Sequence, residues 1–379
     1  MTKLIPVVVI SMILAVISHK RSDYSFSRER YRRKEAICYT IMAVIMILFV
    51  GLRTRYNDTM TYRQGYEMMN SVGSVIDAVT DWSLGSNPGF NLVNAIMKLL
   101  GVSTQSFLLI YAAVTNGIYL WFLRKYTNNI WLTVFLLFTL GIYGFTLAAI
   151  KQCVAIAFCL LAVDHLLDKR CDNPHVPFIL WVAVASFFHP YALMFLAVPF
   201  LMFRPWSKET YQTLLVFGVV GLLLQFLLAT IVNITTMMGE DYSIEILNGE
   251  GVNPFRIAVC AVPVLLSFVA RKQIWQMDEK RERVFFLFTN LSVLNAEIMF
   301  VARFGTANYF ARLANYFLIF QSLAIPWLFQ FFEEKSRKLL TITAVICYSV
   351  YFIYENAIDK VFDADYASIS LLDYLSSLF

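Results

Sequence analysis

The stretch IWLTVFLLFTLGIYGFTLAAIKQCVAIAFCLLAV, residues 130–163, decides the fold of this chain. Its one charged residue is Lys151, and the turn from Gly141 to Gly144 interrupts an otherwise apolar run. A membrane-spanning helix needs roughly 20 apolar residues and tolerates somewhat fewer. The stretch therefore predicts two consecutive spans, 130–146 and 148–167, with Lys151 at the start of the second.

The same pattern extends over the whole chain. Of its 379 residues, 59% are hydrophobic and 15% are charged, against roughly 45–50% and about 25% in soluble domains. This composition indicates a polytopic membrane protein and not a soluble enzyme with one anchor. The net charge of +5 does not indicate nucleic acid binding, because the cations lie in loops between spans and form no basic stripe. The six cysteines show no CxxC motif and no metal-binding spacing.

We predict an all-α chain with about twelve spans. The first, 4–18, lacks a small-x-small cleavage motif and precedes a basic loop, so we interpret it as a span and not as a signal peptide. The stretch 175–203 is either two short spans meeting at His189-Pro190 or one kinked helix with a re-entrant end, because proline disfavours helix in the residue before it. The predicted spans are 4–18, 36–52, 103–123, 130–146, 148–167, 175–189, 190–203, 211–236, 254–270, 284–302, 312–332 and 339–355.

Lysine and arginine residues set the predicted orientation. The loop 19–35 holds seven of them, which places this loop in the cytoplasm. Alternation from there puts the other basic clusters inside as well. We therefore predict a single integral membrane domain, 1–379, with a long outer-face loop at 53–102 that contains an amphipathic helix. An acidic outer-face tail follows at 356–379.

A small set of cations departs from this rule, because each of them lies at the predicted outer end of its span. A cation inside a membrane or at its outer edge is costly, which makes it a candidate functional residue. Several together indicate a pocket for an anion, and arginine forks suit phosphate. The set consists of Arg53, Arg55, Lys151, Arg256, Arg303 and Arg312, together with His189.

Each of these residues also has a structural interpretation. Arg53 and Arg55, followed by Asp58, form either a phosphate clamp with a nearby base or an interfacial anchor with an ion pair. Lys151 either contacts a ligand or extends to the interface. His189 is either a proton acceptor, since imidazole titrates near neutral pH, or a hydrogen-bonded structural residue. A carboxylate paired with an arginine is a weaker base, so we favour His189 over Asp58 as the proton acceptor.

Two further sites lie towards the C-terminus. Arg312 and Tyr316 share one helix face, four residues apart. No acidic residue within one turn neutralises Arg312, which favours an anionic ligand or a distant carboxylate such as Glu297. We do not interpret Asp363-Ala-Asp365 as a metal site, because it lies in the acidic outer tail, away from cytoplasmic nucleotide sugars.

At these positions the sequence resembles the EpsG-like family of Wzy-type polysaccharide polymerases, over about residues 50 to 330. The matching elements are Gly51-Leu-Arg53 through Asp58 and Tyr62, Lys151-Gln152, Phe188-His189-Pro-Tyr-Ala192, and Arg312-Leu-Ala-Asn-Tyr316-Phe317. The chain departs from the family pattern in three places: Lys151 replaces a more usual arginine, Pro190-Tyr191 follows the histidine, and Asp58 follows Tyr-Asn instead of a glycine-rich turn.

The resemblance implies a bundle similar to the GT-C type and a glycosyltransferase that acts at the outer face of a bacterial inner membrane. A growing glycan on undecaprenyl pyrophosphate would be transferred onto a lipid-linked repeat unit, as in O-antigen or exopolysaccharide synthesis. No metal or other cofactor is implied, and a chain-length regulator is a possible partner. The implied catalytic residues are His189 and Asp58. The implied pyrophosphate-binding residues are Arg53, Arg55, Lys151, Gln152, Arg303, Arg312 and Tyr316, and the sugar-contacting residues are Tyr56, Tyr62, Tyr66 and Trp82.

The residues are also compatible with two other functions. A flippase for lipid-linked oligosaccharide would need cations that face a cavity accessible from both sides of the membrane, whereas the unusual cations of this chain lie only at the outer ends of the predicted spans. Inverted repeats would also support a transporter, and we detect none. A ligase that transfers finished glycan onto a lipid core would use the same donor and similar residues.

Overall fold

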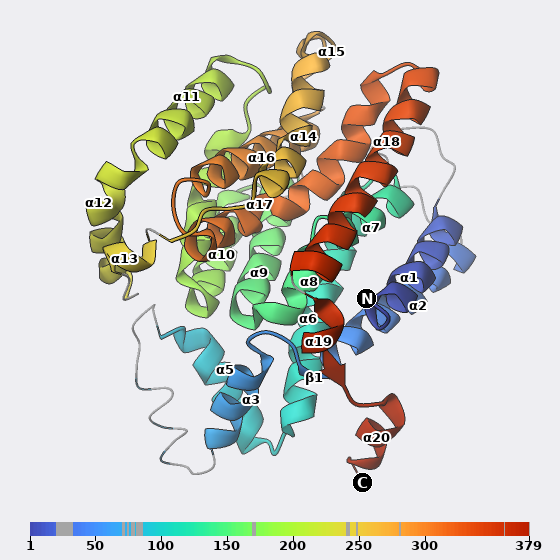
Figure 1. Ribbon diagram of the computed structural model, residues 1–379, viewed down its shortest axis with the longest axis vertical. Coiled ribbons are helices and arrows are strands. Elements are labelled where there is room, and N and C mark those ends of the chain that lie inside the picture. The colour runs from blue at the N-terminus through green and yellow to red at the C-terminus, as the bar shows by residue number, and fades with distance from the viewer. Residues whose placement is uncertain are drawn as a thin grey trace. The chain divides into compact units, whose positions relative to one another are not determined.

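The computed structural model is almost entirely helical, as predicted (Figure 1). It describes residues 1–19, 33–69, 73, 76, 80, 86–168, 172–239, 243–247, 249–279, 282–359 and 361–378. Trp82 and most of the predicted basic loop at 19–35 lie outside the described residues. The described chain forms two compact units, one of Met1–Leu193 with Phe352–Phe379 and one of Met194–Tyr351.

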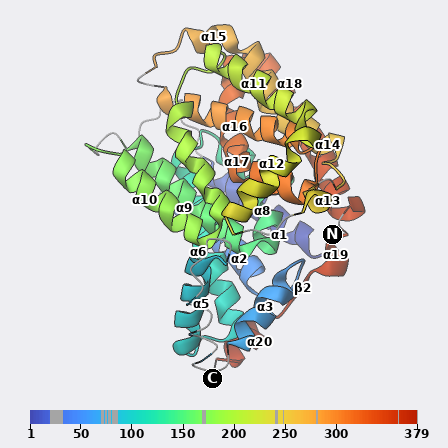
Figure 2. The same ribbon diagram turned by 90° about the vertical axis from the view of Figure 1, so that its left-hand side faces the viewer.

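The first unit contains most of the predicted site. Its elements are α1 (Leu4–Ser18), α2 (Arg33–Gly51), β1 (Arg53–Arg55), α3 (Thr59–Met68), α5 (Pro88–Leu99), α6 (Thr104–Tyr126), α7 (Ile130–Thr139), α8 (Ile142–Ala148), α9 (Ile150–Leu167), α10 (His175–Phe188), η3 (Tyr354–Asp359), α19 (Phe362–Asp365), β2 (Ala367–Ser368) and α20 (Leu371–Ser376). The helix α2 packs between α1 and α6, and α9 packs between α6 and α10. Figure 2 shows α9 and α10 side by side.

Local sequence signals explain where several of these helices begin and end. Ser103 accepts a hydrogen bond from the Ser106 amide at the start of α6, as N-cap serines do. Gly141 adopts a φ of 75°, which favours glycine, and separates α7 from α8. The two helices meet at 50°. The predicted span 130–146 is therefore a bent pair and not one straight helix.

The second unit is built on three mutually packed helices, α14, α16 and α17. Its elements are α11 (Lys208–Leu222), α12 (Leu224–Met237), α13 (Ile244–Leu247), α14 (Pro254–Val269), α15 (Arg271–Trp275), α16 (Arg283–Val301), α17 (Ala307–Leu328), η2 (Phe329–Phe331) and α18 (Glu334–Ile353), and the 3₁₀ helix η1 (Pro190–Leu201) leads into it. Buried amides join two of the central helices: Gln321 Nε2 donates to Asn295 Oδ1 at 2.8 Å, and Asn295 Nδ2 donates to the Ala314 carbonyl at 2.6 Å.

The predicted span 211–236 is not one continuous helix. It is broken between α11 and α12, which meet at 95°. Gly221 lies at this break, where an added Cβ would come within 3.1 Å of the Phe300 ring. Glycine lowers helix propensity, and the close approach to Phe300 gives a reason for a glycine at this point. Apolar periodicity alone does not reveal such a break.

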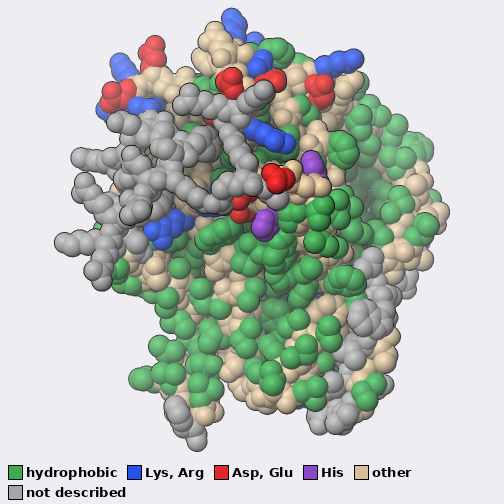
Figure 3. Space-filling view, turned by 180° about the vertical axis from the view of Figure 1, so that it is seen from behind, with side chains coloured by type: hydrophobic (Ala, Val, Ile, Leu, Met, Phe, Trp, Pro, Cys, Tyr) green, Lys and Arg blue, Asp and Glu red, His purple; other side chains and the backbone are tan. Residues whose placement is uncertain are grey.

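Several of the described helices are apolar enough to cross a membrane. Four meet the length and composition of a span, or six if each bent pair is one span. Five other described apolar helices have between 10 and 17 residues. Hydrophobic side chains cover much of the face seen in Figure 3. The structure thus fits a multi-pass membrane protein, and the count of about twelve spans stays a prediction.

Candidate active site

Arg53 lies in the first unit, two residues after the last residue of α2. At Gly51 an added Cβ would lie 2.9 Å from the Leu109 Cα, so the glycine lets the end of α2 approach α6 closely. The chain then turns into β1, and Arg53 is only 1% exposed. A buried arginine is rare in folded proteins unless its nitrogens find acceptors.

Two of the three nitrogens of Arg53 have such acceptors. Nη1 donates to the Val50 carbonyl at 2.6 Å, and Nε donates to Thr59 Oγ1 at 3.0 Å. Val50 lies in the last turn of α2, where free carbonyls favour a cation. Burial lowers the pKa of Arg53 to about 10, so the side chain remains a cation at neutral pH. Within the described part of the chain, Nη2 has no hydrogen-bond partner.

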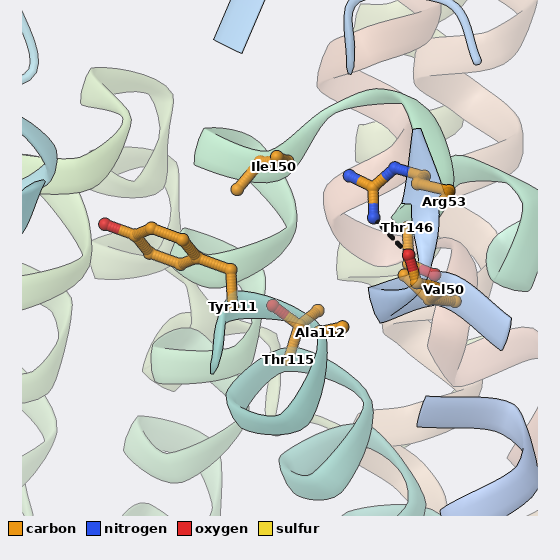
Figure 4. A pocket seen from close by; sticks show the side chains of 7 residues that line it. All are labelled: Val50, Arg53, Tyr111, Ala112, Thr115, Thr146 and Ile150. Carbon is orange, nitrogen blue, oxygen red and sulfur yellow. Dashed lines mark hydrogen bonds between the residues drawn. The ribbon is translucent and has the colours of Figure 1, made fainter. Parts of the chain in front are cut away.

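Arg53, whose Nη2 is described above, lines a small cavity. The cavity has a volume of about 10 Å³, which corresponds to roughly one water molecule. In Figure 4 the guanidinium of Arg53 is turned towards Ile150 and Thr146. The other lining residues are Val50, Tyr111, Ala112 and Thr115. Arg53 therefore directs one N–H group into a confined space between β1, α6, α8 and α9, and a pyrophosphate has no room beside it in this conformation.

Phe90 on α5 brings two other predicted residues together. Lys151 Nζ lies 5.2 Å from the centroid of the Phe90 ring, and the Tyr62 ring lies 5.9 Å from it in an edge-to-face arrangement. Cation–π contacts of this length are favourable. Ile150, the neighbour of Lys151, lines the cavity at Arg53. The elements carrying Arg53, Tyr62 and Lys151 thus meet around α5 and α6, while Gln152 is buried on α9.

His189 follows the end of α10, which packs against α5. An added Cβ at Gly89 would lie 2.8 Å from Phe187 Cβ and 3.1 Å from the Phe187 carbonyl oxygen. His189 lies two residues after Phe187. Its backbone is extended, its side chain is half-buried, and its ring centroid lies 5.0 Å from that of Tyr191. The helix ends before Pro190 as expected, and η1 continues the chain. Both predicted alternatives, two short spans or one kinked helix with a re-entrant end, place a break at His189-Pro190, and the structure has this break; the choice between them stays a prediction.

The contact at Gly89 leads to a stability prediction. Gly89→Ala should force α5 away from α10, because neither Phe187 Cβ nor its backbone can move freely; overpacking of this kind costs about 1–3 kcal/mol. We expect a lower melting temperature of the purified protein and a reduced reaction rate. Gly65→Ala on α3 is the matched control, since an added Cβ there meets nothing within 4 Å. Equal melting temperatures and equal rates of the two variants would show that the α5–α10 contact contributes to neither stability nor activity.

The other predicted residues of the outer loop have mainly structural surroundings. Arg55 is exposed, and its Nε and Nη2 donate to the carbonyls of Asp365 and Ala364 at 3.0 and 2.8 Å. Tyr56 is buried, with its ring 5.0 Å from the Phe362 ring. Asp58 is half-exposed and precedes α3 without a side-chain capping bond.

The predicted sugar-contacting tyrosines differ in their exposure. Tyr66 is buried, stacks on Phe107 at 4.5 Å and donates to the Val102 carbonyl at 2.8 Å. Tyr62 is half-exposed beside Phe90. Of these tyrosines, Tyr62 has the surroundings that best suit contact with a sugar face.

The remaining predicted residues belong to the second unit. Arg303 and Arg312 are exposed, whereas Tyr316 is fully buried, with its ring 6.1 Å from the Phe195 ring. Arg312 and Tyr316 are thus one turn apart on α17 but do not have the same exposure. Arg256 Nη2 donates to Asn315 Oδ1 at 2.9 Å, which joins α14 to α17. The carboxylate of Glu297, considered above as a partner for Arg312, accepts a hydrogen bond from Thr213 Oγ1 at 2.8 Å.

Two residues at the centre of this arrangement had no predicted role, whereas Phe90 was expected as one of several aromatic residues of the outer loop that suit sugar faces. Thr115 and Thr146 line the Arg53 cavity, and each lies inside an apolar helix, where a hydroxyl group gives only a weak signal. Among the residues that the structure describes, no group of three His, Cys, Asp or Glu side chains could hold a metal ion.

Comparison with known protein families identifies the family of this chain. No curated protein and no solved structure matches the chain. A family model described as the EpsG family matches residues 36–374. This range covers the helices that carry all four of the elements on which the resemblance was based. The chain therefore belongs to the EpsG family, which is associated with membrane-bound polymerase-like glycosyltransferases of polysaccharide biosynthesis.

Proposed function

We propose that this protein is a polysaccharide polymerase that lengthens a glycan by transferring it from undecaprenyl pyrophosphate onto a lipid-linked repeat unit. The reaction takes place at the outer face of a bacterial inner membrane, in a GT-C-like bundle of about twelve spans. One observation carries the proposal. Three of the family's elements lie around α5 and α6 in the first unit: Arg53 at a cavity lined by α6, Lys151 over Phe90 of α5, and His189 two residues beyond the contact of Phe187 with Gly89 of α5.

The chemistry needs positive charge and a proton acceptor. An acceptor hydroxyl oxygen attacks the anomeric carbon of the donor glycan, the bond from that carbon to the pyrophosphate oxygen breaks, and the hydroxyl proton moves to a base. Lipid pyrophosphate leaves with its negative charge. Cations placed where this charge develops lower the barrier, and exposed Arg303 and Arg312 are proposed to contact the pyrophosphate directly.

Arg53 is proposed to act from inside the protein. Its charge is fixed by Val50 and Thr59, and in a region of low dielectric constant such a charge acts over a longer distance than it does in water. Ile150, which directly precedes Lys151 and Gln152 in the chain, lines the same cavity. His189 is the proposed proton acceptor, Asp58 is the alternative, and Tyr62 is proposed to contact a sugar ring. Since fixed cations can stabilise the leaving group, we propose a reaction that needs no metal and proceeds in the presence of a chelator.

A deletion strain distinguishes the proposed function from its two alternatives. Loss of a polymerase leaves single lipid-linked repeat units at the outer face. Loss of a ligase leaves long chains that are not attached to a lipid core, and loss of a flippase leaves repeat units in the cytoplasm. Accumulation of single repeats on the outer side, reversed by the intact gene, is the outcome that we expect.

The proposed orientation gives a separate prediction. Met60 on α3 is 44% exposed, so Met60→Cys should react with a membrane-impermeant thiol reagent in intact cells. Ser27→Cys, in the loop predicted to be cytoplasmic, should react only after the cells are opened. The background is the chain with its native cysteines replaced by serine or alanine. Labelling of the Ser27 variant in intact cells would show that the protein has the opposite orientation. This result would contradict the proposed reaction at the outer face.

A further inference from the structure

The C-terminal segment of the chain returns to the element that carries Arg53. In Figure 1 the C-terminal elements α19 and α20 lie at the same end of the first unit as β1. The strands β1 and β2 pair antiparallel, with Arg53 opposite Ser368 and Arg55 opposite Ala367. The Ile369 amide donates to the Leu52 carbonyl at 3.0 Å. We call the segment Phe362–Ile369 the C-terminal clasp.

Aromatic packing holds the clasp against the end of α2. Phe362 is fully buried, and its ring lies 5.0 Å from that of Tyr56. The Tyr366 ring stacks on Phe49 at 4.6 Å, and the Tyr366 hydroxyl donates to the Phe49 carbonyl at 2.8 Å. That carbonyl belongs to the last turn of α2, where carbonyl groups need partners from outside the helix. The clasp therefore supplies a hydrogen-bond donor to a carbonyl group at the C-terminal end of α2.

Polar contacts hold the clasp on the other side of Arg53. Arg55 donates to the carbonyls of Ala364 and Asp365. The backbone N–H of Asn57 donates to the Asp365 carboxylate at 2.7 Å. Asn57 has a φ of 44°, a left-handed conformation that needs support from its surroundings. The segment 49–57 is thus fixed both before and after Arg53.

The pairing also determines which arginine enters the protein. In a regular strand, residues two positions apart lie on the same face. The register is irregular between Arg53 and Arg55, and such irregularities redirect side chains. As a result Arg53 is buried in its cavity while Arg55 is exposed and binds the clasp.

We propose that the C-terminal clasp positions Arg53 for the reaction, and that Arg55 and Asp365 are positioning residues which do not bind substrate. This inference rests on the proposed function and refines it, because it removes Arg55 from the predicted pyrophosphate ligands. Asp365 then acts within the protein's own structure, because its carboxylate accepts the hydrogen bond from the Asn57 backbone N–H.

A disulfide exchange tests the proposal. Arg55→Cys should reduce polymerisation by about 10²-fold, the scale of a misplaced catalytic group. In the double variant Arg55→Cys with Ala367→Cys, the two cysteines occupy positions that are paired across β1 and β2. Directly paired residues of antiparallel strands have Cβ atoms about 4.5–5.5 Å apart, so a small adjustment should allow a disulfide. Oxidation should restore most of the wild-type rate, and reduction should remove it again. The single variant Ala367→Cys, under oxidising and reducing conditions, is the control.

A second readout is independent of activity. Hydrogen–deuterium exchange of purified protein should show slow exchange in segments 49–57 and 362–369 of the wild type. Exchange should be fast in Arg55→Cys and slow again in the oxidised double variant. If the wild type shows the slow exchange but no polymerisation, the proposed function fails while the anchored clasp stands.

Two results would overturn the inference. In the first, the Arg55 variant loses activity with unchanged exchange and the disulfide fails to restore it, which would make Arg55 a substrate ligand. In the second, the clasp exchanges fast in that variant while polymerisation continues at the wild-type rate, which would mean that the clasp does not position the site.

Discussion

Arg53→Ala should abolish polymerisation, and Arg53→Lys should reduce it by about 10²–10³-fold, the cost of removing one electrostatic stabiliser from an active site. Lysine retains the charge but has one nitrogen, whereas Arg53 uses two for Val50 and Thr59 and directs the third into the cavity. An ammonium group cannot satisfy these positions at once. The measurement is the initial rate of polymerisation by purified protein.

Controls are needed because Arg53 also supports the structure. Its hydrogen bonds, being charge-assisted, each contribute about 1.5–3 kcal/mol, so Arg53→Ala will also lower the melting temperature. Arg53→Lys should fold with a smaller shift, which separates catalysis from stability. Lys338→Ala removes a cation that is 72% exposed and paired with Glu334, and it should leave the rate unchanged. Normal polymerisation by a folded Arg53→Lys variant would reduce Arg53 to an anchor of β1.

The second large effect is expected at His189. If its imidazole accepts the proton of the attacking hydroxyl, His189→Gln should lower the rate by about 10²–10⁴-fold, as loss of a general base does. Only the neutral form of a histidine accepts a proton, so the wild-type rate should fall on the acidic side of the pH profile, and this acidic limb should be absent in His189→Gln. Glutamine retains a hydrogen-bonding group of similar size. The pH dependence of the rate in both proteins is the decisive comparison.

Asp58→Asn provides the matched comparison, because Asp58 is the alternative base. Asp58 makes no side-chain capping bond at α3, so its substitution should leave the fold intact. We expect a smaller loss of rate and an unchanged acidic limb. If instead Asp58→Asn removes the acidic limb and His189→Gln retains it, the roles of the two residues are reversed.

The sequence predicted the helical class well and the helix boundaries less well. The runs that became α1, α9 and α10 were located within a few residues because apolar length is a direct signal. The 95° break between α11 and α12 was missed, since Leu222 to Leu224 continue the apolar pattern without interruption. Such breaks depend on tertiary contacts, here of Gly221 with the Phe300 ring.

The chemical type of the site residues was easier to predict than their surroundings. Arg53 and Arg55 form one motif in the sequence, yet one is buried and the other binds the C-terminal clasp. Their separation arises from pairing with β2, more than 300 positions later in the chain, and local patterns carry no information about such a partner. The resemblance likewise implies that Tyr316 binds pyrophosphate, and its spacing from Arg312 predicts a shared helix face, whereas in the structure Tyr316 is fully buried and Arg312 is exposed.

The most direct test of the central claim is reconstitution of the purified protein in proteoliposomes with a single lipid-linked repeat unit. A polymerase should produce a ladder of longer glycans and release one lipid pyrophosphate for each linkage formed, and Arg53→Ala should produce neither. Repeat units that stay single while moving across the bilayer, or that join only an added lipid core, would contradict the proposed polymerase.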